Sequence, residues 1–139
     1  MKVKDFMTLN PRTIHPDTGV KTAFRIMKKG GFKQLPVVDE DELLGIVTDR
    51  NIRRPDIVDD DQDWSTLYRL DDDFRVRGIM TTKIIAVNPD DPLEQACRIL
   101  QKENFNALPV VSDEGELIGI LTVHDLIEPL LTFIGSEAG

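Results

Sequence analysis

The chain has 139 residues, a formal net charge of -8 and a pI near 4.7. This excess of carboxylates argues against nucleic acid as a partner, because phosphate backbones are bound by clustered Lys and Arg, and against anionic membrane surfaces. No apolar run reaches the roughly 18 residues of a membrane span, and the first residues lack the apolar stretch of a signal peptide. The single cysteine excludes an internal disulfide, so we expect a protein of the reducing cytoplasm.

The sequence contains one pattern twice, at a spacing of 73 residues that becomes 74 after Gly115. Aligning residues 3–52 with 76–126 gives 19 identities over 50 positions. The chain is therefore a tandem of two homologous repeats, and a site in one repeat has a counterpart in the other. We place the repeats at residues 1–54 and 75–139, joined by a linker at 55–74.

Each repeat is predicted to form a strand, a helix, two further strands and a second helix, which makes the fold class α+β. The opening strands are expected at residues 13–15 and 84–87, the second being almost entirely β-branched. The helix that follows has apolar residues at i, i+3, i+4 and i+7, a stripe that faces a core. The stripes are Val20, Ala23, Phe24 and Met27, and Leu93, Ala96, Cys97 and Leu100.

Local signals also predict where these helices begin and end. Thr18 and Asp91 are the expected N-caps, with Pro92 as the first helical residue of the second repeat. Gly31 and Asn104 tolerate the left-handed conformation in which many helices end, so we expect the helices to stop there.

The two later strands of each repeat differ in composition. Residues 35–38 and 108–111 each include a proline, which cannot donate to a ladder and predicts an edge or a bulge. After an acidic turn, residues 43–47 and 117–121 are apolar on both faces, which favours central strands. The last helix of the second repeat is expected to break or kink at Pro129.

Both repeats carry the pattern Gly-x-x-Thr-x-x-(Asp/Asn) where the third strand ends and a helix begins. A strand glycine usually marks a bulge or a close backbone approach. A helix N-terminus with a threonine hydroxyl can bind an anion, and a carboxylate beside it can accept from both hydroxyls of a ribose. The same spacing is that of a plain capping box, so both interpretations stay open here. The residues are Gly45, Thr48 and Asn51, and Gly119, Thr122 and Asp125.

Other candidates are weaker. Eight aspartates between residues 56 and 73 predict a solvated linker, with a short amphipathic helical stretch around Trp64 to Leu70. A divalent-metal site is the alternative, but no ligand spacing like that of an EF-hand is present, so no metal is predicted. His15 and His124 are expected at the surface, and Cys97 is interpreted as a small buried hydrophobe.

Taken together, the two repeats resemble a cystathionine-β-synthase (CBS) domain pair, also called a Bateman module. The resemblance covers about residues 2–54 and 75–130. It rests on Val-Lys-Asp-Phe-Met-Thr at 3–8, Leu-Pro-Val-Val-Asp at 35–39 and Gly-Ile-Val-Thr-Asp-Arg-Asn at 45–51, with their partners in the second repeat. The chain resembles stand-alone prokaryotic pairs, including those of the acetoin-utilisation type. This resemblance implies two β-α-β-β-α motifs with pseudo-two-fold symmetry, packed as one module.

The resemblance also implies a regulatory module that binds an adenosyl ligand: AMP, ADP, ATP, S-adenosylmethionine, NAD or cyclic di-AMP. Its sites are expected in clefts between the two motifs. Asp125 would hold the ribose hydroxyls, whereas Asn51 stands where the family usually has aspartate. The implied residues are Thr13, Ile14, Lys33, Gln34, Leu35, Pro36, Thr48, Arg50 and Asn51 in one site, and Ile85, Ala86, Asn106, Ala107, Leu108, Pro109, Thr122, His124 and Asp125 in the other.

Two classes of function remain. One is a sensor that binds an adenosyl effector, with no further cofactor; the other is an interaction or oligomerisation scaffold with degenerate pockets. No Ser-His-Asp or Cys-His arrangement and no Gly-rich phosphate loop is present, so we do not expect an enzyme. A homodimer is expected because closed two-fold symmetry is the commonest assembly.

Overall fold

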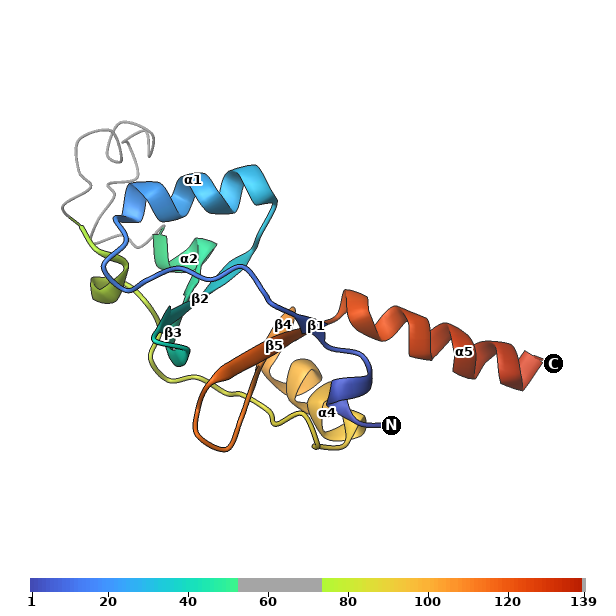
Figure 1. The fold of residues 1–139 in the computed structure, drawn as a ribbon. Helices are drawn as coiled ribbons and strands as arrows, with labels where there is room; N and C mark the ends of the chain where they lie inside the picture. Colours follow the sequence, from blue (N-terminus) through green and yellow to red (C-terminus); the bar gives the residue numbers. More distant parts are fainter. Residues whose placement is uncertain (53–73, 139) are drawn as a thin grey trace. The chain divides into compact units, whose positions relative to one another are not determined.

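The computed structural model describes residues 1–52 and 74–138, which form two compact units (Figure 1). The Asp125 unit comprises Met1–Pro11 and Ile85–Gly139, and the Asn51 unit comprises Arg12–Ile84. The segment that opens each repeat therefore packs with the body of the other repeat. The boundaries at 54 and 75 stay a prediction, and the acidic linker lies outside the described residues.

The Asn51 unit is built on one β-hairpin. Strands β2 and β3 are antiparallel, and β3 is flanked on its other side by a single bridge between Ile46 and Thr81. The opening strand expected at 13–15 is reduced to one parallel bridge, from Ile14 to Val37. The elements are α1 (Val20–Gly30), β2 (Gln34–Asp39), β3 (Glu42–Thr48), α2 (Asp49–Ile52) and the 3₁₀ turn η2 (Val76–Gly78).

The Asp125 unit repeats this arrangement with a sheet of three strands instead of two. Its strand order is β1-β5-β4, so β5 is the central strand that its apolar composition predicts. The expected strand at 84–87 is again one parallel bridge, from Val87 to Val110. The elements are the 3₁₀ turn η1 (Val3–Asp5), β1 (Thr8–Leu9), α4 (Leu93–Glu103), β4 (Ala107–Val111), β5 (Leu117–Thr122), the 3₁₀ turn η3 (His124–Leu126) and α5 (Ile127–Ala138).

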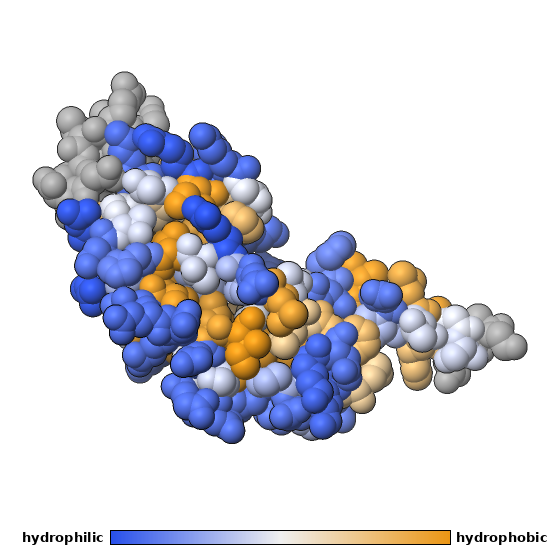
Figure 2. Space-filling model, viewed as in Figure 1, coloured by the Kyte–Doolittle hydropathy of each residue, from blue (hydrophilic) through white to orange (hydrophobic). Residues whose placement is uncertain are grey.

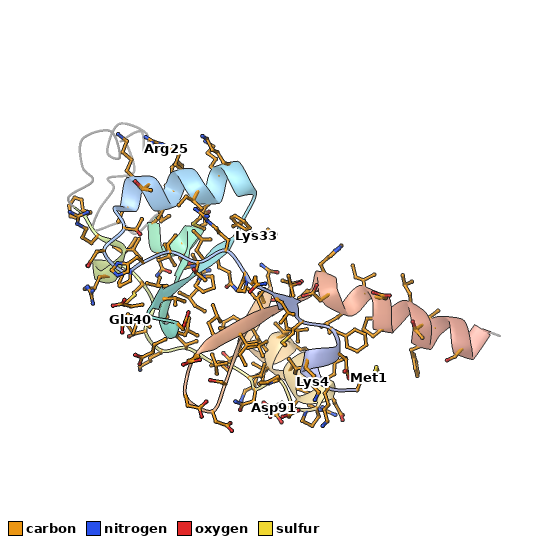
Figure 3. The ribbon with its side chains drawn as sticks, viewed as in Figure 1. Met1, Lys4, Arg25, Lys33, Glu40 and Asp91 are labelled. Carbon is orange, nitrogen blue, oxygen red and sulfur yellow. The ribbon has the colours of Figure 1, made fainter. Side chains whose placement is uncertain are left out.

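Both helix ends are where the sequence predicts them, but both helix starts are not. Gly31 and Asn104 cap α1 and α4 in the left-handed conformation, with φ of 68° and 57°. The predicted N-caps are wrong: Gly19 and Pro92 cap these helices without a side-chain hydrogen bond. The Asp91 carboxylate instead accepts from the backbone N–H of Asn88, three residues earlier, at 2.9 Å. This local hydrogen bond competes with capping of the helix for the same carboxylate. In Figure 3, Asp91 lies close to Lys4, ahead of α4.

The predictions made from the prolines have different outcomes. The register of each hairpin shifts just after its proline, between Val37 and Val38 and between Val110 and Val111, so the predicted bulge is confirmed. The break expected at Pro129 is wrong. Pro129 falls in the first turn of α5, where a missing N–H breaks no intrahelical hydrogen bond.

The apolar stripes of α1 and α4 form the centres of two cores. One core comprises Ile14, Val20, Ala23, Met27, Leu35, Val37, Val47, Ile52, Val76 and Ile79, and the other Val3, Val87, Leu93, Ala96, Leu100, Leu108, Val110 and Leu121. Cys97 is half-buried against the second core, less deeply than predicted. Burial and then the charge of Glu94 raise the pKa of its thiol, which disfavours the reactive thiolate. No helix in the described parts of the chain is long and apolar enough to cross a membrane.

Candidate functional site

The Asp125 site is formed where β5 leads into η3. The backbone N–H of Thr122 donates to Asp125 Oδ2 at 2.9 Å, and the backbone N–H of Asp125 donates to Thr122 Oγ1 at 3.0 Å. The capping-box interpretation of the sequence pattern is therefore confirmed as geometry. A third residue joins them, because the Thr8 hydroxyl lies 3.2 and 3.3 Å from the two carboxylate oxygens of Asp125 and donates to them.

The Asn51 site has the same backbone arrangement at the start of α2. The N–H of Thr48 donates to Asn51 Oδ1 at 2.8 Å, and the N–H of Asn51 donates to Thr48 Oγ1 at 3.2 Å. The third partner is Thr81, whose hydroxyl accepts from Asn51 Nδ2 at 3.1 Å. The site thus presents an amide at the position where the other unit presents a carboxylate.

Thr8 and Thr81 are site residues that the sequence interpretation missed. They are related by the 73-residue repeat and belong to the segments that precede each repeat's own helices. The strand glycines explain why these segments lie so close. A Cβ on Gly119 would lie 2.6 Å from the backbone oxygen of Thr8, and one on Gly45 would lie 2.9 Å from that of Thr81. The predicted close backbone approach at the strand glycines is confirmed. The segment that approaches each glycine contains a Met-Thr pair, and the repetition of this pair in the sequence is the signal that could have identified Thr8 and Thr81.

An open hollow of about 460 Å³ lies beside Asp125 in the same unit. Three carboxylates line it, from Asp5, Asp125 and Glu128, and it has no Lys or Arg among its lining residues. Its apolar walls and its one histidine are Phe6, Met7, Ile127, Leu131 and His124. Because like charges repel, this hollow disfavours a strongly anionic group and tolerates a neutral or cationic one.

Many of the predicted base-binding residues are buried in the two hairpins. The buried set is Ile14, Leu35, Pro36, Ala107, Leu108 and Pro109. Several of their backbone groups already have partners, since Pro36 O accepts from Ile14 N and Pro109 O accepts from Val87 N. The carbonyl of Asn106 likewise accepts from Val123 N at 2.9 Å.

The remaining predicted residues are more accessible. Lys33, Arg50, Ile85, Asn106 and His124 are exposed, and Figure 3 shows Lys33 beyond the end of α1. Thr13, Ala86, Thr48 and Thr122 are half-buried.

Gln34 is also half-buried, and its side-chain nitrogen Nε2 has no solvent contact and no hydrogen-bond partner. An unpaired buried donor is costly, and the equivalent residue of the other repeat is Ala107, which has no such group.

Metal chemistry finds no support in the described residues, among which no group of three or more His, Cys, Asp or Glu could hold an ion. The acidic linker, for which a metal site was the alternative interpretation, lies outside them.

A family model described as "CBS domain" matches this chain twice, at residues 3–56 and 76–132. Three solved structures illustrate the similarity. CBSX2 from Arabidopsis thaliana, solved with AMP, is 32% identical with a TM-score of 0.78, covering 94% of this chain and 97% of that one. The CBS domain pair of MJ0100, solved with 5'-methylthioadenosine and S-adenosyl-L-methionine, is 27% identical with a TM-score of 0.72, covering 94% and 95%. AcuB, a proposed acetoin-utilisation protein from Vibrio cholerae, is 25% identical with a TM-score of 0.79, covering 99% and 96%.

Proposed function

The chain belongs to the CBS-domain family, and we propose that it is a sensor module that binds an adenosyl ligand at the Asp125 site. The observation that carries the proposal is the placement of the Asp125 carboxylate between Thr122 and Thr8. A carboxylate has about four acceptor positions, and these two donors occupy only part of that capacity. The remainder suits the two neighbouring hydroxyls of a ribose.

Related proteins support the adenosyl class of ligand. CBSX2 was solved with AMP, and the MJ0100 pair with 5'-methylthioadenosine and S-adenosyl-L-methionine. AMP and S-adenosyl-L-methionine differ in charge, since AMP carries a phosphate and S-adenosyl-L-methionine carries a sulfonium cation. The charges of this chain's own sites therefore matter for the choice between them.

We expect the two sites to differ in ligand charge. The three carboxylates that line the hollow, Asp5, Asp125 and Glu128, favour an adenosyl group with little or no phosphate. In the Asn51 unit, Arg50 is exposed one residue before Asn51 and a guanidinium can bind phosphate oxygens with two hydrogen bonds. The Asn51 site is therefore proposed to prefer ligands that carry phosphate, with Gln34 Nε2 as an available donor.

The rest of each site is proposed to hold the base. In the Asp125 site these residues are Ile85, Ala86, Asn106, Ala107, Leu108 and Pro109, and in the Asn51 site Thr13, Ile14, Lys33, Gln34, Leu35 and Pro36. Because their buried side chains belong to the cores, Leu35 and Leu108 can contribute backbone groups only. A ligand held in this way would act as a regulatory effector and not as a substrate.

Titration calorimetry with AMP and with S-adenosylmethionine tests this proposal. Asp125→Ala should weaken binding at that site by about 10- to 150-fold, the cost of a charged hydrogen-bond partner. Asp125→Asn is the sharper variant, because Asn51 shows that asparagine keeps the same cap. It should bind about fivefold more weakly than the wild type.

The matched control is Asp113→Ala, which removes a carboxylate from the β4–β5 turn of the same unit and should leave affinity unchanged. Unaltered binding by both folded Asp125 variants would contradict the assignment. If none of the adenosyl ligands raises the melting temperature of the wild type, the scaffold alternative is favoured instead.

A further inference from the structure

Helix α1 carries a basic outer side in a chain that is acidic overall. Residues 20–33 contain five of the 17 Lys and Arg of the sequence and neither Asp nor Glu. Figure 2 shows hydrophilic residues over the outer side of this helix, and Figure 3 shows Arg25 there. The cations of α1 recur at i, i+4, i+7 and i+8, which places them on one side of the helix. We call Lys21, Arg25, Lys28 and Lys29 the α1 basic face.

The α1 basic face has no compensating carboxylate. Lys21 is half-buried and the other three side chains are exposed. Among the described residues, none of the four forms an ion pair with an Asp or Glu. Like charges four residues apart destabilise a helix, and a cation in the first turn opposes the helix dipole. Lys21 has both effects, because it lies in the first turn and four residues before Arg25. These charges therefore destabilise α1.

The equivalent helix of the other repeat shows that the fold does not require such a face. Glu94 of α4 stands at the position of Lys21. Its carboxylate pairs with Arg98, the equivalent of Arg25, at 2.6 Å. An acidic residue in the first turn with a basic partner four residues later satisfies both the helix dipole and the pairing preference. The two acidic and two basic residues of α4 balance, so one repeat has a neutral helix where the other has a basic one.

We propose that the α1 basic face binds an acidic segment of another protein. Each residue of a helix rises by about 1.5 Å, so the cations from Lys21 to Lys29 span about 12 Å in steps of about 6 Å. Carboxylates one helical turn apart, or on alternate residues of an extended segment, repeat every 5–7 Å or so, about the same step. Lys28 is positioned for such a contact, because its Nζ lies 5.5 Å from the centre of the Phe24 ring. None of the four residues belongs to either adenosyl site.

An acidic protein segment fits this face better than a nucleic acid or an anionic membrane. Both of those polyanions extend far beyond the roughly 12 Å of the face. The whole chain has a net charge of -8, so the remainder of the chain repels an extended polyanion. A protein segment can place its carboxylates opposite the face alone, and salt screens exposed charges that lie more than about 8 Å away.

Fluorescence anisotropy with a labelled peptide tests the proposal on the full chain. The probe has about 20 residues with Glu at every fourth position among alanines, and the same peptide with Gln is the neutral probe. The wild type should bind the Glu peptide and not the Gln peptide, and added salt should weaken the binding. Arg25→Glu combined with Lys29→Glu should weaken it by about tenfold or more, because two attractions become repulsions.

Arg98→Glu combined with Lys102→Glu is the matched control, because it makes the same change of charge at the equivalent positions of α4. Its affinity for the Glu peptide should stay within about twofold of the wild type. All four side chains are exposed, so circular dichroism should show both variants folded. A wild type that does not bind the Glu peptide at low salt would overturn the proposal, and so would equal losses in the two variants.

Two further results would assign the α1 basic face to a different occupant. Peptide binding that appears only when Asp59→Asn, Asp60→Asn and Asp61→Asn are combined would assign it to the acidic linker of this chain. Binding of double-stranded DNA or of phosphatidylglycerol vesicles, without binding of the Glu peptide and lost in Arg25→Glu with Lys29→Glu, would assign it to a phosphate polyanion.

Discussion

The two units hold different chemical groups with the same pair of backbone hydrogen bonds. In the Asp125 unit the Thr8 hydroxyl donates to a carboxylate, whereas in the Asn51 unit the Thr81 hydroxyl accepts from an amide. The backbone N–H groups and the capping threonines are arranged alike in both. The geometry of the turn therefore follows from the backbone and the capping threonine. The side chain three residues after that threonine decides which ligand groups each site can bind.

The likeness extends to the ion pairs that the opening segment of each repeat makes. Lys4 contacts Asp90 at 3.1 Å, and the equivalent Arg77 contacts Asp17 at 3.2 Å. All four side chains are largely exposed, so these pairs contribute little to stability compared with the close packing at the strand glycines.

The largest expected effect is the loss of stability in Gly119→Ala. Its Cβ would lie 2.6 Å from a backbone oxygen, which cannot move aside without shifting β1. We expect a loss of about 3 kcal/mol. Gly45→Ala should cost less, about 1–2 kcal/mol, because its backbone contact with the Thr81 oxygen is longer, at 2.9 Å, and its nearest contact is the flexible Met80 side chain at 2.7 Å.

Urea denaturation measures both losses, and Gly78→Ala is the control because no atom lies within 4 Å of its added Cβ. The control should remain within about 0.5 kcal/mol of the wild type. Equal losses in Gly119→Ala and Gly78→Ala would show that β1 is not held by close packing.

A second prediction concerns a variant that makes the Asn51 site resemble the Asp125 site. Asn51→Asp should strengthen the binding of adenosine at the Asn51 site by about 1 kcal/mol, or fivefold, since charged hydrogen bonds are stronger than neutral ones. The variant should fold, because a carboxylate already occupies the equivalent cap beside Thr8. Calorimetry with adenosine measures the gain. Adenosine bound only at the wild-type Asn51 site would contradict our ranking of the two sites for ligands without phosphate.

The smallest expected effect concerns Asp90. Its hydrogen bond with Lys4, and then the charges of Lys4 and Lys2, lower the pKa of this carboxyl below 3.8. A lowered pKa in the folded state adds stability above the unfolded pKa, and this stability is lost as the pH falls through the folded value. Asp90→Asn should therefore be slightly less stable than the wild type at neutral pH.

The difference should shrink as the solution is acidified below about 3.8 and as salt is added. Urea midpoints of both proteins across this pH range provide the test. A difference that grows on acidification would mean that the Lys4–Asp90 contact does not stabilise the folded chain.

The sequence by itself determined the tandem repeat, the α+β class, the helix stripes and the left-handed caps at Gly31 and Asn104. These features depend on periodicity and on single-residue conformational preferences, which are local. The capping boxes at Thr48 and Thr122 belong to the same class, because each needs only residues three positions apart.

Only the tertiary structure decided what depends on distant segments. Asp91 is a good N-cap by local rules, but its carboxylate bonds to Asn88, and the opening strands shrink to single bridges. Likewise no local pattern states that Thr8 reaches Asp125, 117 residues away. That contact exists because Gly119 has no side chain, so the Thr8 backbone can approach β5 and occupy the position where a Cβ would lie. Whether two segments come this close is decided by the packing of the elements against one another.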